Sequence, residues 1–277
     1  MTESPESSVN ARTIRDAIAD TLERGSVAAL ITVIKSPNLN AGAKLFVADS
    51  GETFGDLGQT HLNHAVTAAV PQFFRGRAEV QVYSSRDIAP LEDELPETQL
   101  LFERIEAEPQ LVIAGAGHVG AALARLGALV RYRVTLIDDR AEFVSRDAFA
   151  APTEQDIELV TAADWAAAIR AAVGAGRGVS VAIVTRGHKQ DEECLRAVLA
   201  SNPDYIGMIG SKRRTNIVLD KLREEDFAEA QLRKVRAPIG LDIRAVSPEE
   251  VALAILAEIV AERRGGKGGS LSSWRRS

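Results

Sequence analysis

Leu111-Val-Ile-Ala-Gly-Ala-Gly-His-Val-Gly120 is the stretch that decides the fold of the second part of this chain. A short apolar run, long enough for a buried strand, leads directly into glycines at 115, 117 and 120. Gly115 permits a tight turn, Gly117 lets the backbone approach a pyrophosphate, and Gly120 lets the next helix pack closely on the strand. The free N–H groups at the helix start would hold phosphates. The pattern predicts a nucleotide-binding loop of Rossmann type, with ligand-binding candidates Gly115, Gly117, His118 and Gly120.

A carboxylate stands where a dinucleotide-binding fold needs one. About twenty residues beyond the glycines, the segment Arg133-Val-Thr-Leu-Ile-Asp-Asp139 ends a second predicted strand. Asp138 is the candidate acceptor for ribose hydroxyls, and Arg140 beside it would tolerate a 2′-phosphate. The same pattern also fits a Rossmann fold whose loop is purely structural, because a fold does not fix a function.

From Glu108 onward strand and helix signals alternate along the chain. The strands are continuous apolar runs, which are typical of a parallel sheet covered by helices on both faces. Strands are predicted over 111–114, 133–137, 157–160, 179–185 and 205–209, and helices over 119–130, 162–173, 189–201, 212–224 and 248–264. We therefore predict an α/β, Rossmann-like domain over 108–264, followed by a Gly/Ser-rich, disordered tail over 265–277.

The first part of the chain lacks this regular alternation. Helices are predicted over 11–24 and 61–74, and short strands over 27–34, 44–47 and 80–83. Together they predict a smaller α+β domain over 1–84. The following segment, 85–107, contains Pro90, Pro96 and a cluster of acidic residues, a composition that favours a linker.

Composition narrows the class of protein. The 277 residues suffice for two domains. The 39 acidic residues outnumber the 33 basic ones, giving a net charge of −6, which disfavours nucleic acid or an anionic membrane as partner. We find no secretion signal and no apolar run near the roughly 18 residues of a membrane span. The single cysteine, Cys194, fits a reducing cytoplasm, and its acidic neighbours favour a packing role over a nucleophilic one.

The segment Thr185-Arg-Gly-His-Lys-Gln-Asp191 directly follows a predicted strand, where ligand-facing residues of open α/β sheets lie. His188 and Asp191 stand three apart at a helix start, so they could share a face and bind a ligand or metal together. The alternative is a helix cap beside a solvated histidine. Because no further His or Cys stands at a metal-ligand spacing from this pair, we predict no metal site built by the protein alone.

Tyr205-Ile-Gly-Met-Ile-Gly-Ser-Lys-Arg-Arg214 again runs from strand through a glycine turn into a helix. Cations at a helix start oppose its dipole, so they indicate an anionic ligand such as a phosphate or a pterin phosphate. A solvated basic face is the alternative. A further glycine turn, Pro238-Ile-Gly-Leu-Asp-Ile243, is predicted to face the same crevice. The two turns add the candidates Gly210, Ser211, Lys212, Arg213, Gly240 and Asp242.

These motifs, in this order, resemble the Rossmann half of the XdhC/CoxI family over about residues 108–264. The resemblance implies an accessory protein for molybdenum hydroxylases such as xanthine dehydrogenase and CO dehydrogenase. Such a protein binds molybdenum cofactor, protects it during sulfuration and hands it to the client enzyme. The resemblance therefore implies a chaperone and not an enzyme, a homodimer, and a cysteine desulfurase as a further candidate partner.

The first half departs from the family pattern. Family members carry a Ser-Ser-Pro-Arg element and, later, a Gly-Gly-Gly or Gly-Gly-Cys turn followed by Glu. Here the first element reads Ser36-Pro-Asn-Leu-Asn40, without its arginine, and Ser36 remains as a candidate phosphate contact. The second reads Gly55-Asp-Leu-Gly-Gln-Thr-His-Leu-Asn63, with His61 at the cysteine position and Asn63 at the glutamate position.

Two other classes of protein fit the glycine loop. An NAD(P)-dependent oxidoreductase would use the loop and Asp138 for the nucleotide, with His188 as acid or base. A nucleotide-sensing regulatory Rossmann module would use the loop alone. The sequence shows neither a Tyr-x-x-x-Lys nor a convincing His–Asp arrangement for proton transfer, and the accessory hypothesis also accounts for the basic turn at Lys212.

Overall fold

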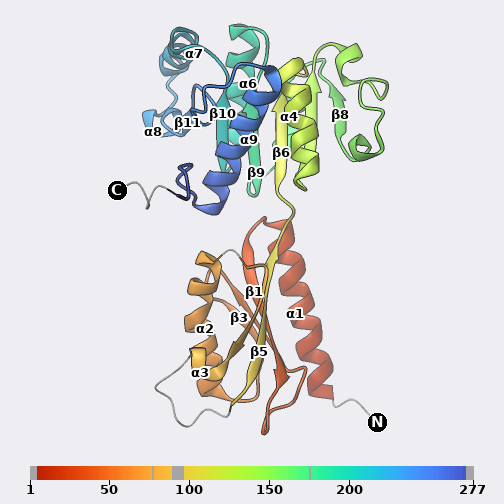
Figure 1. The fold of residues 1–277 in the computed structure, drawn as a ribbon, viewed down its shortest axis with the longest axis vertical. Coiled ribbons are helices and arrows are strands. Elements are labelled where there is room, and N and C mark those ends of the chain that lie inside the picture. The colour runs from red at the N-terminus through yellow and green to blue at the C-terminus, as the bar shows by residue number, and fades with distance from the viewer. Residues whose placement is uncertain (1–4, 77, 89–96, 175, 273–277) are drawn as a thin grey trace. The chain divides into compact units, whose positions relative to one another are not determined.

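The computed structural model describes residues 5–76, 78–88, 97–174 and 176–272. The chain forms two compact units, Met1–Ala107 and Glu108–Ser277 (Figure 1). No helix among the described residues combines the length and the apolar character needed to cross a membrane.

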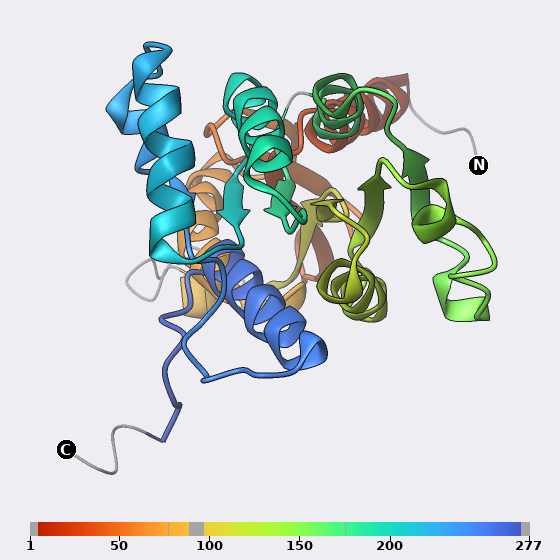
Figure 2. The ribbon, with the colours of Figure 1, turned by 90° about the horizontal axis from the view of Figure 1, so that it is seen from above.

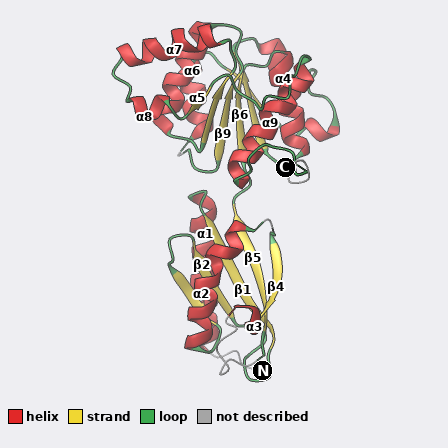
Figure 3. Ribbon diagram, turned by 60° about the vertical axis from the view of Figure 1, so that its left-hand side comes forward, coloured by secondary structure: helices red, strands yellow, loops and turns green. Residues whose placement is uncertain are grey.

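The first unit is an antiparallel sheet with one long helix on each face. Its strand order is β3-β2-β1-β5-β4, and Figure 3 shows the strands in yellow. On one face α2 buries Leu62, Val66 and Val70, and on the other α1 packs Ile14 near Phe46. The elements in chain order are α1 (Pro5–Glu23), β1 (Val27–Lys35), β2 (Lys44–Ala48), β3 (Thr53–Asp56), α2 (Thr60–Arg75), β4 (Val80–Ser84), α3 (Ser85–Ile88) and β5 (Gln99–Glu106).

The prediction of a linker over 85–107 is wrong for its second half. Residues 99–106 form β5, which pairs with β1 along its whole length and with β4 on its other side. Leu100 and Phe102 are fully buried there because they alternate toward the face that α2 covers. Ser85–Ile88 is the short helix α3, and residues 89–96 lie outside the described residues. The strand β3 was also not predicted.

The second unit is a six-stranded sheet in which all neighbouring pairs are parallel. The order β11-β10-β9-β6-β7-β8 reads 6-5-4-1-2-3 within this unit, which is the Rossmann arrangement. Its strands are β6 (Gln110–Ala114), β7 (Arg133–Asp138), β8 (Glu158–Thr161), β9 (Val179–Ile183), β10 (Tyr205–Met208) and β11 (Val235–Arg236). Its helices are α4 (His118–Leu129), α5 (Trp165–Val173), α6 (His188–Ser201), α7 (Lys212–Glu224), α8 (Glu229–Leu232) and α9 (Pro248–Arg264), with short 3-10 turns η1 (Ala141–Val144) and η2 (Pro152–Glu154).

Helices cover both faces of this sheet, as the view from above shows (Figure 2). In the central strand β6, Leu111 and Ile113 pack with α4 and α9, whereas Val112 and Ala114 pack with α5 and α6. A strand buried on both sides must be apolar at every position, which explains its uninterrupted apolar sequence. The predicted fold class is therefore confirmed: a parallel, Rossmann-like sheet preceded by a smaller α+β unit.

The last helix begins and ends at its sequence signals. Ser247 accepts the N–H of Glu250, and the Glu250 carboxylate accepts the N–H of Ser247, so the capping box is formed. Gly265 ends α9 with φ +66. Of the predicted disordered tail, residues 265–272 are described as turns and irregular backbone, and residues 273–277 lie outside the described residues.

Candidate functional site

The glycine loop combines two packing glycines with one that leaves space open. A Cβ on Gly115, whose φ is +112, would lie 2.7 Å from the Val184 carbonyl oxygen. A Cβ on Gly120 would overlap the carbonyl oxygen of Gly115. Gly117 is the N-cap of α4, and a Cβ there would meet no atom within 4 Å. The loop can thus accommodate a ligand at Gly117, in front of the N–H groups that begin α4.

The position of this loop is set by the strand order. β6 lies between β7 and β9, where the order of strands reverses and ligands of open α/β sheets bind. The backbone joins the three strand ends, because Gly115 N–H donates to Ile137 O at 2.7 Å and Val184 N–H donates to Ala114 O at 2.8 Å. The residues predicted after these strands therefore lie along one edge of the sheet.

Asp138, at the end of β7, is bound by other protein groups. Its Oδ2 accepts the N–H of Ala116 at 2.7 Å and Nη2 of Arg140 at 3.0 Å. Its Oδ1 accepts Nε of Arg140 at 2.9 Å and the N–H of Arg140 at 3.0 Å. Burial alone would raise the pKa of Asp138, but these hydrogen bonds outweigh it and lower the pKa to about 2. Asp138 is therefore a carboxylate that locks the glycine loop onto the end of β7.

A second carboxylate–guanidinium pair lies beside the first. Nη2 of Arg186, in the loop after β9, donates to Oδ2 of Asp139 at 2.9 Å. The guanidinium carbon of Arg140 lies 3.7 Å from the centre of the Phe143 ring. The loops after β7 and β9 are thus joined by an ion pair on both sides of the glycine loop's own strand.

Thr185, Asp191 and Arg214 form a buried network at the ends of β9 and β10. The Thr185 hydroxyl donates to Oδ1 of Asp191 at 2.6 Å, and Nε of Arg214 donates to Oδ2 of Asp191 at 2.6 Å. Nη2 of Arg214 also donates to the Thr185 carbonyl oxygen at 3.1 Å. Burial raises the pKa of Asp191, and the bonds from Thr185 and Arg214 act in the opposite direction. The prediction that Asp191 and His188 share a face is wrong: Asp191 is fully buried and His188 is exposed.

The basic turn at the start of α7 divides into inward and outward residues. Arg214, which was not among the predicted site residues, faces Asp191, whereas Lys212 and Arg213 are exposed. Ser211 caps α7 by accepting the N–H of Arg214 at 3.3 Å, and a Cβ on Gly210 would lie 3.3 Å from Cδ of Arg214. The structure therefore leaves Lys212 and Arg213 as the cations open to an anion.

The remaining candidates are separated by their surroundings. His118 and Asp242 are exposed. Gly240 donates its N–H to Oε2 of Glu258 at 2.8 Å, and the Tyr205 hydroxyl donates to the same oxygen at 2.5 Å. Gly240 thus ties the turn after β11 to α9. Among the described residues, no group of three or more His, Cys, Asp or Glu side chains is placed to hold a metal ion.

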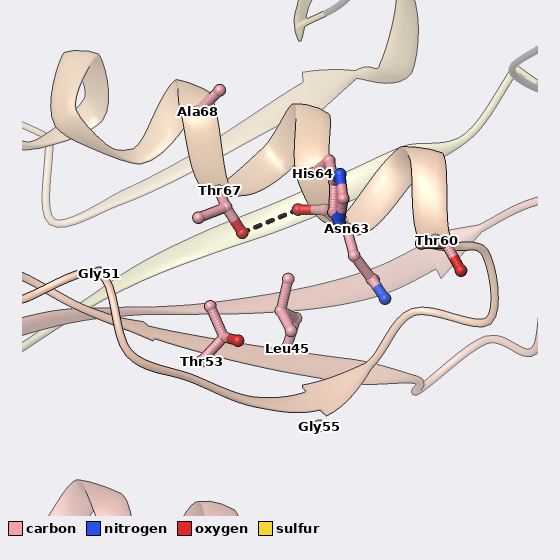
Figure 4. Close-up of a pocket in the computed structure, with 9 residues that line it drawn as sticks. All are labelled: Leu45, Gly51, Thr53, Gly55, Thr60, Asn63, His64, Thr67 and Ala68. Atoms are coloured by element: carbon pink, nitrogen blue, oxygen red, sulfur yellow. Dashed lines mark hydrogen bonds between the residues drawn. The ribbon is translucent and has the colours of Figure 1, made fainter.

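The first unit has a pocket of about 610 Å³ that the sequence did not indicate. Figure 4 shows it between α2 and the strands β2 and β3. The polar residues that line it are Thr53, Thr60, Asn63, His64 and Thr67. Among the described residues lining the pocket, none is Lys, Arg, Asp or Glu. Hydroxyl, amide and imidazole groups of this kind suit a polar ligand without requiring a charge on it.

The departures from the family pattern in this unit are used to hold turns. Oδ1 of Asn63 accepts the N–H of Leu57 at 3.0 Å, and its Nδ2 donates to Oδ1 of Asp56 at 2.7 Å. The Ser36 hydroxyl accepts the N–H of Leu39 at 3.2 Å and lies 3.0 Å from the Thr98 hydroxyl. The side chains of Asn63 and Ser36 therefore stabilise local backbone. His61 is exposed.

Comparisons with known proteins match both units. The model of the XdhC Rossmann domain matches residues 111–259, and that of the XdhC and CoxI family matches residues 21–84. The crystal structure of a xanthine dehydrogenase from Bacillus halodurans has a similar fold, with a TM-score of 0.61 and 21% identity, covering 96% of this chain and 69% of that chain.

Curated relatives agree with these matches. The chain is 32% identical over 161 residues to the uncharacterized protein YqeB of Escherichia coli K12, covering 58% of this chain and 28% of that protein. It is 26% identical over 167 residues to a probable xanthine dehydrogenase subunit of Bacillus subtilis 168, covering 60% and 47%. It is 33% identical over 69 residues to the molybdenum cofactor insertion chaperone PaoD of Escherichia coli K12, covering 25% and 22%. The chain spans less than half the length of each relative. With the Rossmann match extending over more than half of its own length, the chain belongs to the XdhC and CoxI family.

Proposed function

We propose that this protein binds molybdenum cofactor and assists its insertion into a molybdenum hydroxylase of the xanthine dehydrogenase or CO dehydrogenase type. The observation that carries the proposal is the family match of both units, taken with a relative named as a molybdenum cofactor insertion chaperone. A second relative is named as a probable xanthine dehydrogenase subunit, which supports this class of client.

The residues at the sheet edge fit the phosphate end of such a ligand. At Gly117 a side chain would occupy the space in front of the α4 N–H groups, and glycine leaves that space free. Lys212 and Arg213 are exposed at the start of α7 and add positive charge. When bound, the cofactor supplies the molybdenum centre, and this chain supplies phosphate binding and orientation.

Sulfuration assisted by this protein would use sulfur from a partner. Cys194 is the only cysteine of the sequence and is fully buried. Burial, together with the charges of Asp191 and Glu193, raises the pKa of its thiol. Because a sulfur carrier needs an accessible thiolate, we propose that a cysteine desulfurase delivers sulfur to the cofactor directly. We further propose that the protein acts in the cytoplasm as a homodimer.

An NAD(P)-dependent oxidoreductase has less support. It would need Asp138 to accept ribose hydroxyls, and both oxygens of Asp138 are already bonded to Arg140 and Ala116. It would also need a proton-transfer pair, whereas Asp191 is buried against Arg214 and His188 lies apart from it. No relative found in the comparisons is named for a nicotinamide nucleotide.

The deciding experiment compares ligands on the full chain. Purified protein is titrated with molybdopterin, its cytidine dinucleotide form, NAD and NADP, and the loaded protein is then mixed with a cofactor-free hydroxylase. We expect stoichiometric pterin binding and transfer that activates the hydroxylase. Tight NADPH binding without pterin binding would contradict the proposal. Gly117→Val is the matched variant, which should fold normally and fail to bind.

A further inference from the structure

The carboxylate of Asp138 has no acceptor capacity left for a ribose. An ionised carboxylate has about four lone-pair sites, and Asp138 accepts four N–H groups from Ala116 and Arg140. Its side chain is only 3% exposed. In dinucleotide-binding Rossmann folds, the carboxylate at the end of this strand accepts hydrogen bonds from the ribose hydroxyls. Here the side chain two residues along the chain makes those bonds instead.

The guanidinium of Arg140 is held in that position from several sides. Nε and Nη2 form a bidentate contact with the two oxygens of Asp138, the strongest geometry for this kind of pair. One face of the guanidinium lies on the Phe143 ring. Asp139, the other carboxylate at this strand end, receives Nη2 of Arg186. Both carboxylates at the end of β7 are therefore matched by a guanidinium.

We propose that Arg140 is a specificity-determining residue that closes the ribose subsite at the end of β7. The glycine loop then takes ligands that end in a phosphate and excludes ligands that need a ribose diol bound by Asp138. Resting on the proposed function, this inference selects the pterin monophosphate over the cytidine dinucleotide as the form of cofactor carried.

Removal of the Arg140 side chain should open the subsite in a defined way. Without the guanidinium, Oδ2 of Asp138 keeps the Ala116 N–H and Oδ1 keeps the Arg140 N–H, both from the backbone. Two acceptor positions become free, one on each oxygen. These suit the two hydroxyls of a vicinal diol, which a ribose carries at its 2′ and 3′ carbons.

The test uses two nucleotides that differ only in this diol, ADP and 2′,3′-dideoxy-ADP, titrated calorimetrically into the full chain. Wild-type protein should bind the two equally, or neither. Arg140→Ala should bind ADP at least about tenfold more tightly than the dideoxy nucleotide, since hydrogen bonds to a charged group have this strength. The inference is overturned if wild-type protein already prefers ADP to that degree, or if Arg140→Ala gains no preference.

Three further variants separate a specific effect from loss of structure. Arg133→Ala removes an exposed arginine at the opposite end of β7 and should behave as wild type. Phe143→Ala removes the ring contact but leaves the bonds to Asp138, so the subsite should stay closed. Asp138→Ala added to Arg140→Ala should abolish the gained preference. Thermal unfolding of each variant shows that it is folded under the binding conditions.

The cofactor form is tested in a separate arm. Wild-type protein should bind molybdopterin more tightly than its cytidine dinucleotide form, and Arg140→Ala should narrow that difference. Tighter binding of the dinucleotide by wild-type protein contradicts the selection of the monophosphate. Absence of binding to either pterin contradicts the proposed function, while the ADP titrations still decide whether Arg140 closes the subsite.

Discussion

Nε of Arg214 donates to Oδ2 of Asp191 at 2.6 Å, and this contact ties the first turn of α7 to the first turn of α6. Asp191 is fully buried, and the Arg214 side chain is 26% exposed. The pair therefore holds two loops at the ligand-binding edge of the sheet in one arrangement, with the Thr185 hydroxyl as third member. Several expectations about stability and binding follow from this and the neighbouring contacts.

Asp191→Ala should lower the free energy of unfolding by about 3–5 kcal/mol, because it leaves a largely buried guanidinium without its partner. Urea unfolding followed by the fluorescence of the buried Trp165 measures the change in the second unit. Asp220→Ala, which breaks the exposed pair with Arg223, is the matched control and should cost less than about 1 kcal/mol. Equal losses in the two variants would show that the Asp191 pair is not structural.

Substitutions at Gly117 and Gly120 should separate binding from stability. Gly117→Val changes a position with free space and an ordinary φ of −65, so the loss of stability should stay within about 1 kcal/mol while pterin binding is lost. Gly120→Ala forces a methyl group onto the Gly115 carbonyl and should cost about 1–3 kcal/mol or more. Urea unfolding and pterin titration of both variants check this. Normal binding by Gly117→Val would mean that the loop is only structural.

Asp138 should make stability depend on pH in the acid range. Its pKa falls from 3.8 to about 2 on folding, so its ionised form stabilises the folded state above pH 3.8. That contribution, about 2 kcal/mol, is lost as the pH falls from about 4 through 2. Thermal unfolding between pH 5 and pH 2.5 should therefore show a smaller decrease for Asp138→Asn than for wild type. Parallel decreases would rule out this carboxylate as the source.

Cys194 should be unreactive in the folded protein. Its side chain is fully buried and its thiol pKa is raised by burial and by nearby carboxylates. We expect an aromatic disulfide reagent to release no colour from native protein at pH 8, and one equivalent after unfolding in urea. Rapid labelling of the native protein would contradict the burial and reopen a role for Cys194 as a sulfur carrier.

Much of the fold was predictable from the sequence because its signals are local. In the second unit each apolar strand is followed by its own helix, and α9 carries its capping box and its terminal glycine within its own residues. β5 shows the limit. Its neighbours in sequence are acidic and resemble a linker, and only its pairing with β1 and β4, far along the chain, makes it a strand.

The site divides in the same way. The sequence by itself determined that a glycine loop, a carboxylate at the end of the second strand and a basic helix start belong to one Rossmann edge. Only the tertiary structure decided that Arg140 occupies Asp138, and that Arg214 turns inward to Asp191 while Lys212 and Arg213 stay exposed. The physical reason is that residue types and their spacing specify which groups reach an edge, whereas hydrogen-bond partners depend on how separate loops pack against one another.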